Sequence, residues 1–285
     1  MFKESLKQYI YLMRFHKPIG IYLLLWPTLW ALWLAGEGSP NINIVIIFIV
    51  GVVLMRAAGC IINDIADRHF DGHVKRTQER PIAAGKISVK NALILFVILL
   101  FCAFLLVLPL NRLTLLLAFF GAGIAGVYPY MKRFTHLPQL GLGIAFAWGV
   151  PMAFAAQSDS IALNAWLVFL AAALWPVIYD TMYAMVDRED DIKIGVKSTA
   201  ILFGKYDCLV LGILQIVFLV LLIVMGLTFS LNEYYFLSLI AVSMLLLYQQ
   251  ILINKRTRDG YFKAFLNNHW VGFFVFLGIL LSETL

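Results

Sequence analysis

Residues 42–71 read INIVIIFIVGVVLMRAAGCIINDIADRHFD, and they join a long apolar run to an acidic end. The apolar part is long enough for a membrane-spanning helix, which needs roughly 20 mostly apolar residues. On a helix that turns about 100° per residue, Asn63, Asp67 and Asp71 follow at i, i+4 and i+8. Arg56, inside the run, points the same way. The stretch therefore predicts a membrane helix with one polar stripe at its end.

The remainder of the chain is equally apolar. Of its 285 residues, 62% are hydrophobic and 13% are charged, whereas soluble domains carry about 25% charged residues. No run alternates with the period of a strand. The sequence predicts an all-α, polytopic membrane protein, a single transmembrane domain over 1–285. Its nine candidate spans are 19–35, 42–62, 91–110, 113–131, 138–157, 164–186, 208–228, 233–252 and 268–282.

The first 17 residues differ from these spans. They carry four basic residues, and apolar residues recur among them at near-helical spacing. This pattern is typical of an amphipathic helix on a membrane surface, and it does not match a cleavable signal peptide. We expect such a surface helix over 1–17, followed by a retained first span.

Basic residues are distributed unevenly between the two ends of the spans. In a nine-span topology, 20 of the 22 Lys and Arg residues fall on one side, Arg112 falls on the other, and Arg56 lies within a span. Short cytoplasmic loops carry the excess of Lys and Arg in membrane proteins. The basic side is therefore expected to be cytoplasmic. Because the formal charge of +6 resides in these short loops, it does not indicate a nucleic-acid partner.

A second acidic cluster ends the sixth candidate span. It reads YDTMYAMVDREDD over 179–191. Asp180, Asp187 and Asp191 follow at i, i+7 and i+11, so Asp187 and Asp191 lie about 20° to either side of Asp180 on a helical wheel, and Tyr183 lies one turn from Asp180. Four spans separate the two clusters, so both reach the same side. This indicates two pseudo-repeated four-helix halves plus one further helix.

Carboxylates stacked on one helix face repel each other unless a cation lies among them. Oxygen ligands without His or Cys partners suit Mg²⁺ or Ca²⁺, and Mg²⁺ is commonly shared with substrate phosphates. The surrounding cations favour a phosphate ligand; they are Arg68, Lys75, Arg76, Arg80, Lys132 and Arg188. Arg56 lies within a span, where an ionisable residue needs a partner. Asp180 or a bound anion could supply it.

The two acidic motifs, NDxxDxxxD over 63–71 and YDxxYAxxDxxDD over 179–191, resemble those of the UbiA superfamily of intramembrane prenyltransferases. Shorter matches extend the resemblance over essentially the whole chain. They are Arg14 with Lys17-Pro18-Ile19-Gly20, Asp71-Gly72 through Arg80-Pro81, Tyr128-Pro129 with Lys132-Arg133, and Lys197-Ser198-Thr199 before Phe203-Gly204. The segment 179–204 is most similar to the bacterial 4-hydroxybenzoate polyprenyltransferases of ubiquinone synthesis.

The resemblance implies nine helices around a central cavity in the bacterial inner membrane. It implies Mg²⁺ as cofactor, and polyprenyl diphosphate and 4-hydroxybenzoate as substrates. Metal ligands would be Asn63, Asp67, Asp71, Asp187 and Asp191, with Asp64 as a further candidate. Arg14, Arg56 and Lys132 would hold the diphosphate or the acceptor, with Arg68, Arg133, Asp180 and Tyr183 as further substrate-binding candidates. The residues expected to carry the chemistry are Asp67, Asp71, Asp187, Asp191 and Arg56.

Two other interpretations fit parts of the pattern. A prenyltransferase could use another acceptor, such as homogentisate, a naphthoate, haem or chlorophyllide. A divalent-cation transporter could also line its path with acids, but transporters place such sites near the midplane of the membrane in broken helices. The acidic clusters here stand mostly at span ends among many cations, which favours a bound phosphate. The sequence specifies neither the prenyl length nor the oligomeric state.

Overall fold

The computed structural model of the chain describes every residue except 1, 70 and 74–76. All regular structure in the described part is helical. The α-helices are α1 (Phe2–Leu12), α2 (Ile19–Ala35), α3 (Ile42–Asp67), α4 (Val89–Val107), α5 (Arg112–Val127), α6 (Pro138–Ala147), α7 (Gly149–Ser158), α8 (Leu163–Ile194), α9 (Thr199–Phe203), α10 (Asp207–Thr228), α11 (Glu233–Asn254) and α12 (Arg258–Thr284). Three short 3-10 segments join them: η1 (Asp71–His73), η2 (Tyr128–Arg133) and η3 (Gly204–Tyr206).

The helices agree with the predicted spans in type and order. Over the described residues, eight helical segments are long and apolar enough to cross a membrane, and α2, with 17 residues, is a shorter apolar helix. The pair α6 and α7 forms one of the eight segments. The prediction of an all-α, polytopic membrane protein is confirmed, with a span count close to the expected nine.

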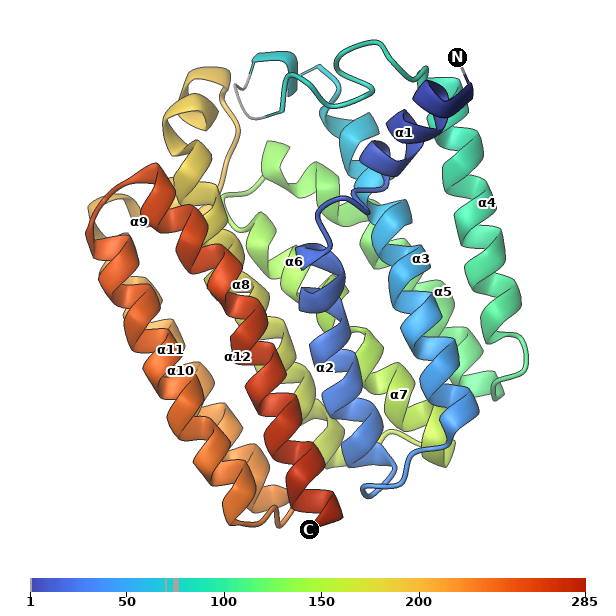
Figure 1. Cartoon of the computed structure of the whole chain (residues 1–285), viewed down its shortest axis with the longest axis vertical. Coiled ribbons are helices and arrows are strands. Elements are labelled where there is room, and N and C mark those ends of the chain that lie inside the picture. Colours follow the sequence, from blue (N-terminus) through green and yellow to red (C-terminus); the bar gives the residue numbers. More distant parts are fainter. Residues whose placement is uncertain (1, 70, 74–76) are drawn as a thin grey trace.

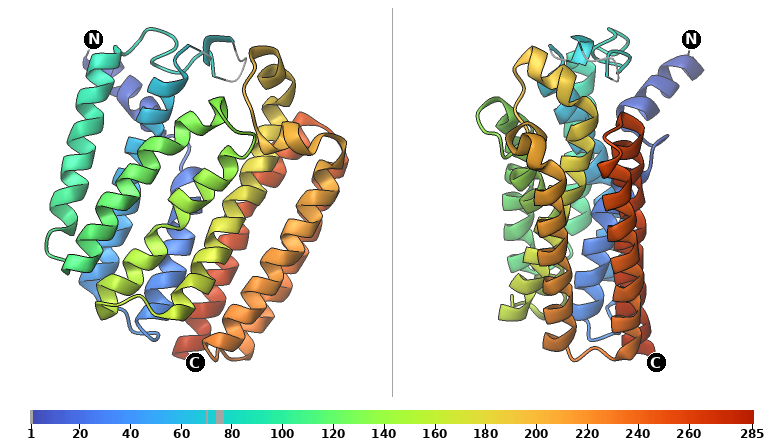
Figure 2. Two further views of the ribbon diagram at one scale, coloured as in Figure 1. Left: turned by 180° about the vertical axis from the view of Figure 1, so that it is seen from behind. Right: turned by 90° about the vertical axis from the view of Figure 1, so that its left-hand side faces the viewer.

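The long helices run side by side along the long axis of the molecule (Figure 1, Figure 2). Helix α2 packs against α3, α7 and α12, while α8 packs against α6, α10 and α12. The last helix, α12, also packs against α11. Helices from the two ends of the chain, α2 and α12, are therefore in contact. In the core between them, the rings of Trp30 and Trp175 lie 5.4 Å apart, and the Trp30 indole N–H donates to the Gly272 carbonyl.

The outer faces of the helices are apolar, as a lipid environment requires. On α4, Val97 is 61% exposed and Phe101 is 59% exposed. Helices α10 and α11 expose Ile216 and Leu247 in the same way. Side chains of this kind are buried in a soluble domain, so these faces are those that the hydrocarbon core of a bilayer covers.

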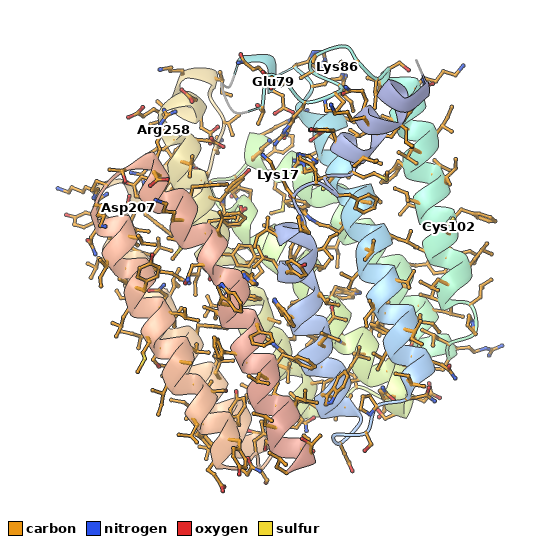
Figure 3. The ribbon with its side chains drawn as sticks, viewed as in Figure 1. Lys17, Glu79, Lys86, Cys102, Asp207 and Arg258 are labelled. Atoms are coloured by element: carbon orange, nitrogen blue, oxygen red, sulfur yellow. The ribbon has the colours of Figure 1, made fainter. Side chains whose placement is uncertain are left out.

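Charged side chains gather at one end of the molecule. Lys17, Glu79 and Lys86 lie at this end in Figure 3, and Asp207 and Arg258 lie toward it on the side of α8 to α12. The C-terminus lies at the opposite end (Figure 1). We call the end that carries these charges the polar end.

The first helix is shorter than expected. Helix α1 ends at Leu12 rather than near residue 17, because the chain turns sharply at Arg14, whose φ of 58° is left-handed. Leu12 is fully buried in a cluster with Ala57 and Ile61 of α3. This contact fixes α1 at the polar end of α3. Its placement on a membrane surface stays a prediction.

The prediction of one continuous helix from Arg56 to Asp71 was wrong. Helix α3 ends at Asp67, and Asp71 begins the separate segment η1. The last carbonyls of a helix lack intrahelical donors, and here two arginines supply them. Arg68 donates to the Ile65 carbonyl, and Arg133 donates to the Ala66 carbonyl. With these carbonyls hydrogen-bonded, the helix ends before Asp71.

Candidate active site

Three carboxylates from α3 and η1 are buried at the polar end, and arginines bridge two of them. Asp64 is 2% exposed and Asp71 is 5% exposed. The Arg80 guanidinium lies 3.2 Å from an Asp64 oxygen and 2.9 Å from an Asp71 oxygen. Arg14 donates to Asp64 at 2.6 Å. Arg80 therefore ties Asp71 to Asp64 at the end of α3, although Asp71 lies outside the helix.

Asp67 is paired at only one of its two oxygens. Its Oδ2 accepts from the Lys132 ammonium of η2. Its Oδ1 is buried and has no hydrogen-bond partner in the described part of the chain. A buried carboxylate oxygen without a partner is costly, and it is a hard donor of the kind that Mg²⁺ prefers. This position fits a divalent cation.

The carboxylates do not form a preassembled metal cluster. Among the described residues, no three His, Cys, Asp or Glu side chains converge in a way that could hold an ion. Burial raises the pKa of Asp71, the Arg80 guanidinium opposes that rise, and the negative charges of Asp67 and Asp64 add to it. Lys132, Arg14 and Arg80 thus supply the positive charge among these acids.

The second acidic stripe lies on one continuous helix, as predicted. Helix α8 runs from Leu163 to Ile194 and includes Asp180, Asp187 and Asp191. Asp187 is buried and the other two are half-buried. Gln139 of α6 fixes the deepest of them, since its Nε2 donates to Asp180 at 3.3 Å while its Oε1 accepts from the Thr199 amide.

The two stripes face a common interior. The hydroxyl of Tyr128, at the start of η2, interacts electrostatically with Asp67 of the first stripe and with Asp180 of the second. Segment η2 also touches both sides directly. Its Lys132 side chain pairs with Asp67, and its Lys132 carbonyl accepts from the Lys197 amide after α8.

Arg56 lies inside this interior without an ionic partner among the described residues. It makes no hydrogen bond or ion pair with them, so of the two partners that the sequence left open, Asp180 and a bound anion, Asp180 does not pair with it. Its guanidinium lies over the ring of Phe146, 5.7 Å from the centroid. It also lies against Gly20, where a Cβ atom would collide with it. A guanidinium held in this way is positioned to receive an anion.

The remaining candidates are two pairs of residues and Asn63. Arg68 and Arg133 are exposed and cap α3, as described above. Arg14, which follows α1, and Tyr183, on α8, interact electrostatically with each other. The Tyr183 ring packs 4.6 Å from Phe265 of α12. Asn63 is half-buried on α3.

Sequence reasoning missed several residues that line the interior. Arg80 was recognised only as a nearby cation, although it bridges two of the acids. Tyr128, Tyr179 and Gln139 were not singled out at all. The two tyrosines stand inside the quoted motifs, Tyr128-Pro129 and the tyrosine before Asp180, so the motifs could have identified them. Gln139 carries no such signal.

Comparison with known proteins agrees with this arrangement. Residues 24–278 match the model of the UbiA prenyltransferase family. A protein from Coxiella burnetii (strain RSA 331 / Henzerling II) named 4-hydroxybenzoate octaprenyltransferase is 56% identical over 281 residues, which are 99% of this chain and 98% of that protein. A protein of the same name from Alkalilimnicola ehrlichii is 55% identical over 96% of this chain and 94% of its own length.

Solved structures share the fold. A UbiA homologue from Aeropyrum pernix K1, in its apo form, superimposes with a TM-score of 0.81 at 26% identity, covering 90% of this chain and 97% of that one. A UbiA homologue from Archaeoglobus fulgidus, bound to GPP and Mg²⁺, superimposes with a TM-score of 0.71 at 18% identity, covering 95% and 99%. At 18% identity, the similarity to the Archaeoglobus fulgidus structure concerns the fold alone. With its two carboxylate stripes, its helical architecture and a family match over most of its length, this chain belongs to the UbiA prenyltransferase family.

Proposed function

We propose that this protein transfers a polyprenyl chain from polyprenyl diphosphate to 4-hydroxybenzoate and releases diphosphate, as a step of ubiquinone synthesis. The observation that carries the proposal is that segment η2 joins the two carboxylate stripes, since its Lys132 side chain pairs with Asp67 and its carbonyl accepts from Lys197 after α8. Arg56, over the Phe146 ring, supplies a cation with no ionic partner among the described residues. The names of relatives at 55 to 56% identity over nearly the whole chain support the same substrates.

The carboxylates would hold Mg²⁺. Asp67 fits best, because one of its oxygens is buried and unpartnered; the other ligands would be Asn63, Asp64, Asp71, Asp187 and Asp191. When bound, the ion stabilises negative charge on the leaving diphosphate. Lys132, Arg14 and Arg80 now pair with the acids, and they can turn toward the phosphate oxygens when a donor binds.

The acceptor would bind deeper in the membrane than the donor diphosphate. Arg56 lies 11 residues before Asp67 on α3, a rise of roughly 16 Å at 1.5 Å per residue. A planar guanidinium matches a carboxylate with two parallel hydrogen bonds. With its carboxylate at Arg56, the aromatic acid directs its opposite, hydroxyl-bearing end toward the acidic stripes.

This placement accounts for the reaction. The bond between C1 of the prenyl chain and the diphosphate oxygen breaks, and its electron pair leaves with the diphosphate. A π pair of the acceptor ring forms the new bond from the carbon next to the hydroxyl, and that carbon then loses its proton. The buried Tyr179 ring, packed against Trp175, would help to exclude the water that would otherwise capture the cationic fragment.

The experiment that tests the proposal is product analysis with purified protein in sealed vesicles. Given polyprenyl diphosphate, Mg²⁺ and a panel of aromatic acceptors, the protein should prenylate 4-hydroxybenzoate and release one diphosphate per product. The basic bias supports a cytoplasmic position for the polar end, so external substrates should react in inside-out vesicles. If only another acceptor is prenylated, the acceptor assignment is wrong; transport of Mg²⁺ without any prenylated product contradicts the enzyme assignment.

Replacing Arg56 by lysine should separate acceptor binding from donor binding. Lysine keeps the charge but loses the planar fork, so KM for 4-hydroxybenzoate should rise roughly tenfold or more while KM for the donor stays nearly constant. Arg112→Lys is the matched control, since Arg112 is exposed at the opposite end. Steady-state kinetics with each substrate varied in turn measures the difference. A variant that melts early with both KM values unchanged would show that Arg56 is structural.

A further inference from the structure

The hydroxyl of Tyr179 is buried and has no hydrogen-bond partner in the described part of the chain. Tyr179 lies on α8 directly before Asp180, and only 2% of the residue is exposed. Its hydroxyl oxygen is inaccessible and unpartnered. A buried hydroxyl that makes no hydrogen bond destabilises the folded protein. Such a group is expected where a ligand supplies the missing partner.

The ring of Tyr179 is held firmly, so its hydroxyl is a fixed group. The Trp175 ring lies 5.3 Å away at an interplanar angle of 86°, and the Phe265 ring of α12 lies 6.1 Å away. Tyr235, a second buried tyrosine, shows the usual arrangement for comparison. Its hydroxyl donates to the Leu222 carbonyl at 2.9 Å. Tyr179 has no corresponding backbone acceptor among the described residues.

The surroundings of this hydroxyl identify the ligand class. It interacts electrostatically with Arg56, Asp180 and Tyr128, so it belongs to the interior that Arg56 also faces. Arg56 is itself without an ionic or hydrogen-bonded partner among the described residues. Two unpaired donors in one interior, a guanidinium and a phenol O–H, fit a ligand with two acceptor oxygens on one carbon.

Depth favours a carboxylate over a phosphate at this position. Tyr179 lies eight residues before Asp187 on α8, a rise of roughly 12 Å toward the membrane centre. Arg56 lies 11 residues before Asp67 on α3, a rise of roughly 16 Å. A diphosphate held at Asp67 and Asp187 would lie roughly these distances above the two donors, whereas the acid group of an acceptor bound below it would lie between them.

We propose that the Tyr179 hydroxyl donates a hydrogen bond to the carboxylate of the aromatic acceptor beside Arg56, which makes Tyr179 a specificity-determining residue for aromatic acids. This inference rests on the proposed function, since it concerns the acceptor of that reaction. In this proposal the Tyr179 hydroxyl strengthens binding of the acceptor, and the same unpartnered hydroxyl destabilises the protein when no acceptor is bound.

Tyr179→Phe tests the proposal because it removes only the oxygen. The dissociation constant of 4-hydroxybenzoate, measured by calorimetry on purified protein, should rise roughly tenfold. KM for the prenyl diphosphate should not change. The unfolding temperature of the ligand-free protein should stay constant or rise, because an unsatisfied buried hydroxyl has been deleted. A merely structural role would give the opposite result, a lower unfolding temperature with unchanged affinity.

Tyr235→Phe is the matched control. It removes a buried hydroxyl from the same bundle, but one that is hydrogen-bonded to the backbone. It should lower the unfolding temperature and leave acceptor affinity unchanged. A second comparison uses the methyl ester of 4-hydroxybenzoate, which lacks the negative charge. The difference between wild type and Tyr179→Phe should be much smaller for the ester than for the acid.

Unchanged affinity of Tyr179→Phe for 4-hydroxybenzoate would overturn the proposal. So would a rise in KM for the prenyl diphosphate alone, which would place the hydroxyl at the phosphate. Failure of the proposed function gives a different result. In that case wild type forms no prenylated acid, and the binding comparison still decides the role of Tyr179. Wild-type protein that does not bind the acid at all would contradict both proposals.

Discussion

Replacing Asp67 by alanine should lower turnover by about 10²- to 10³-fold while the protein still inserts into the membrane. The carboxylate offers one oxygen to Lys132 and keeps the other buried and unpartnered. Alanine removes both oxygens and leaves the Lys132 ammonium without its partner. The site then loses a metal ligand and the counter-charge that positions a phosphate-binding cation.

The measurement is the rate of diphosphate release at saturating substrates, normalised to folded protein. Asp259→Ala is the matched control, because this carboxylate is 72% exposed and, among the described residues, pairs only with Lys263 one turn away. Surface pairs of this kind contribute little to stability, so the control should keep its full rate. Near-normal turnover of Asp67→Ala would show that Asp67 is not a residue of the active site.

Removing divalent cations should abolish activity. All the side chains expected to hold the metal offer oxygen ligands, which suit Mg²⁺ and give no soft or imidazole donor for zinc. Without the ion, the diphosphate would have to leave against the repulsion of several carboxylates. Excess EDTA should therefore stop prenyl transfer, and added Mg²⁺ should restore it.

The control for chelation is an unfolding curve recorded in EDTA, which separates loss of catalysis from loss of structure. Lys132, Arg14 and Arg80 neutralise the acids in the metal-free protein, so the unfolding temperature should change little. Full prenyl transfer in excess EDTA would contradict the metal assignment, whatever the stability of the protein.

The sequence predicted the scaffold well because membrane helices depend on local composition. Each span needs an apolar run of sufficient length, and this property can be read without knowledge of the neighbouring helices. The acidic stripe of α8 was predicted for a similar reason. Asp180, Asp187 and Asp191 lie on one uninterrupted helix, so their angular positions followed from helical geometry alone.

The end of α3 could not be predicted in this way. The helical periodicity of the sequence predicted that the helix continues to Asp71, whereas in the structure it ends at Asp67. One of the groups that caps it, Arg133, lies more than 60 residues away in the chain. The bridge that ties Asp71 to Asp64 at the end of α3 is made by Arg80 from a loop. Contacts between distant segments leave no trace in a local pattern.

The interior site shows the same limit. Arg56 was expected to need an anion, but its neighbours were unknown: Phe146 comes from α6 and Gly20 from α2. Gly20 could be recognised in a motif, yet its purpose, space for a guanidinium, appears only when α2 and α3 pack. The unpartnered hydroxyl of Tyr179 likewise depends on packing, because the surrounding helices, among the described residues, place no hydrogen-bond acceptor near it.

The central claim is that the stripes of α3 and α8 act together to hold a metal ion and the donor diphosphate. It is tested most directly by calorimetric titration of the purified protein with an unreactive polyprenyl diphosphate analogue, with and without Mg²⁺. Wild-type protein should bind the analogue only when Mg²⁺ is present, and Asp67→Ala and Asp187→Ala should each abolish that binding. Equal binding without Mg²⁺, or undiminished binding by either variant, would contradict the account.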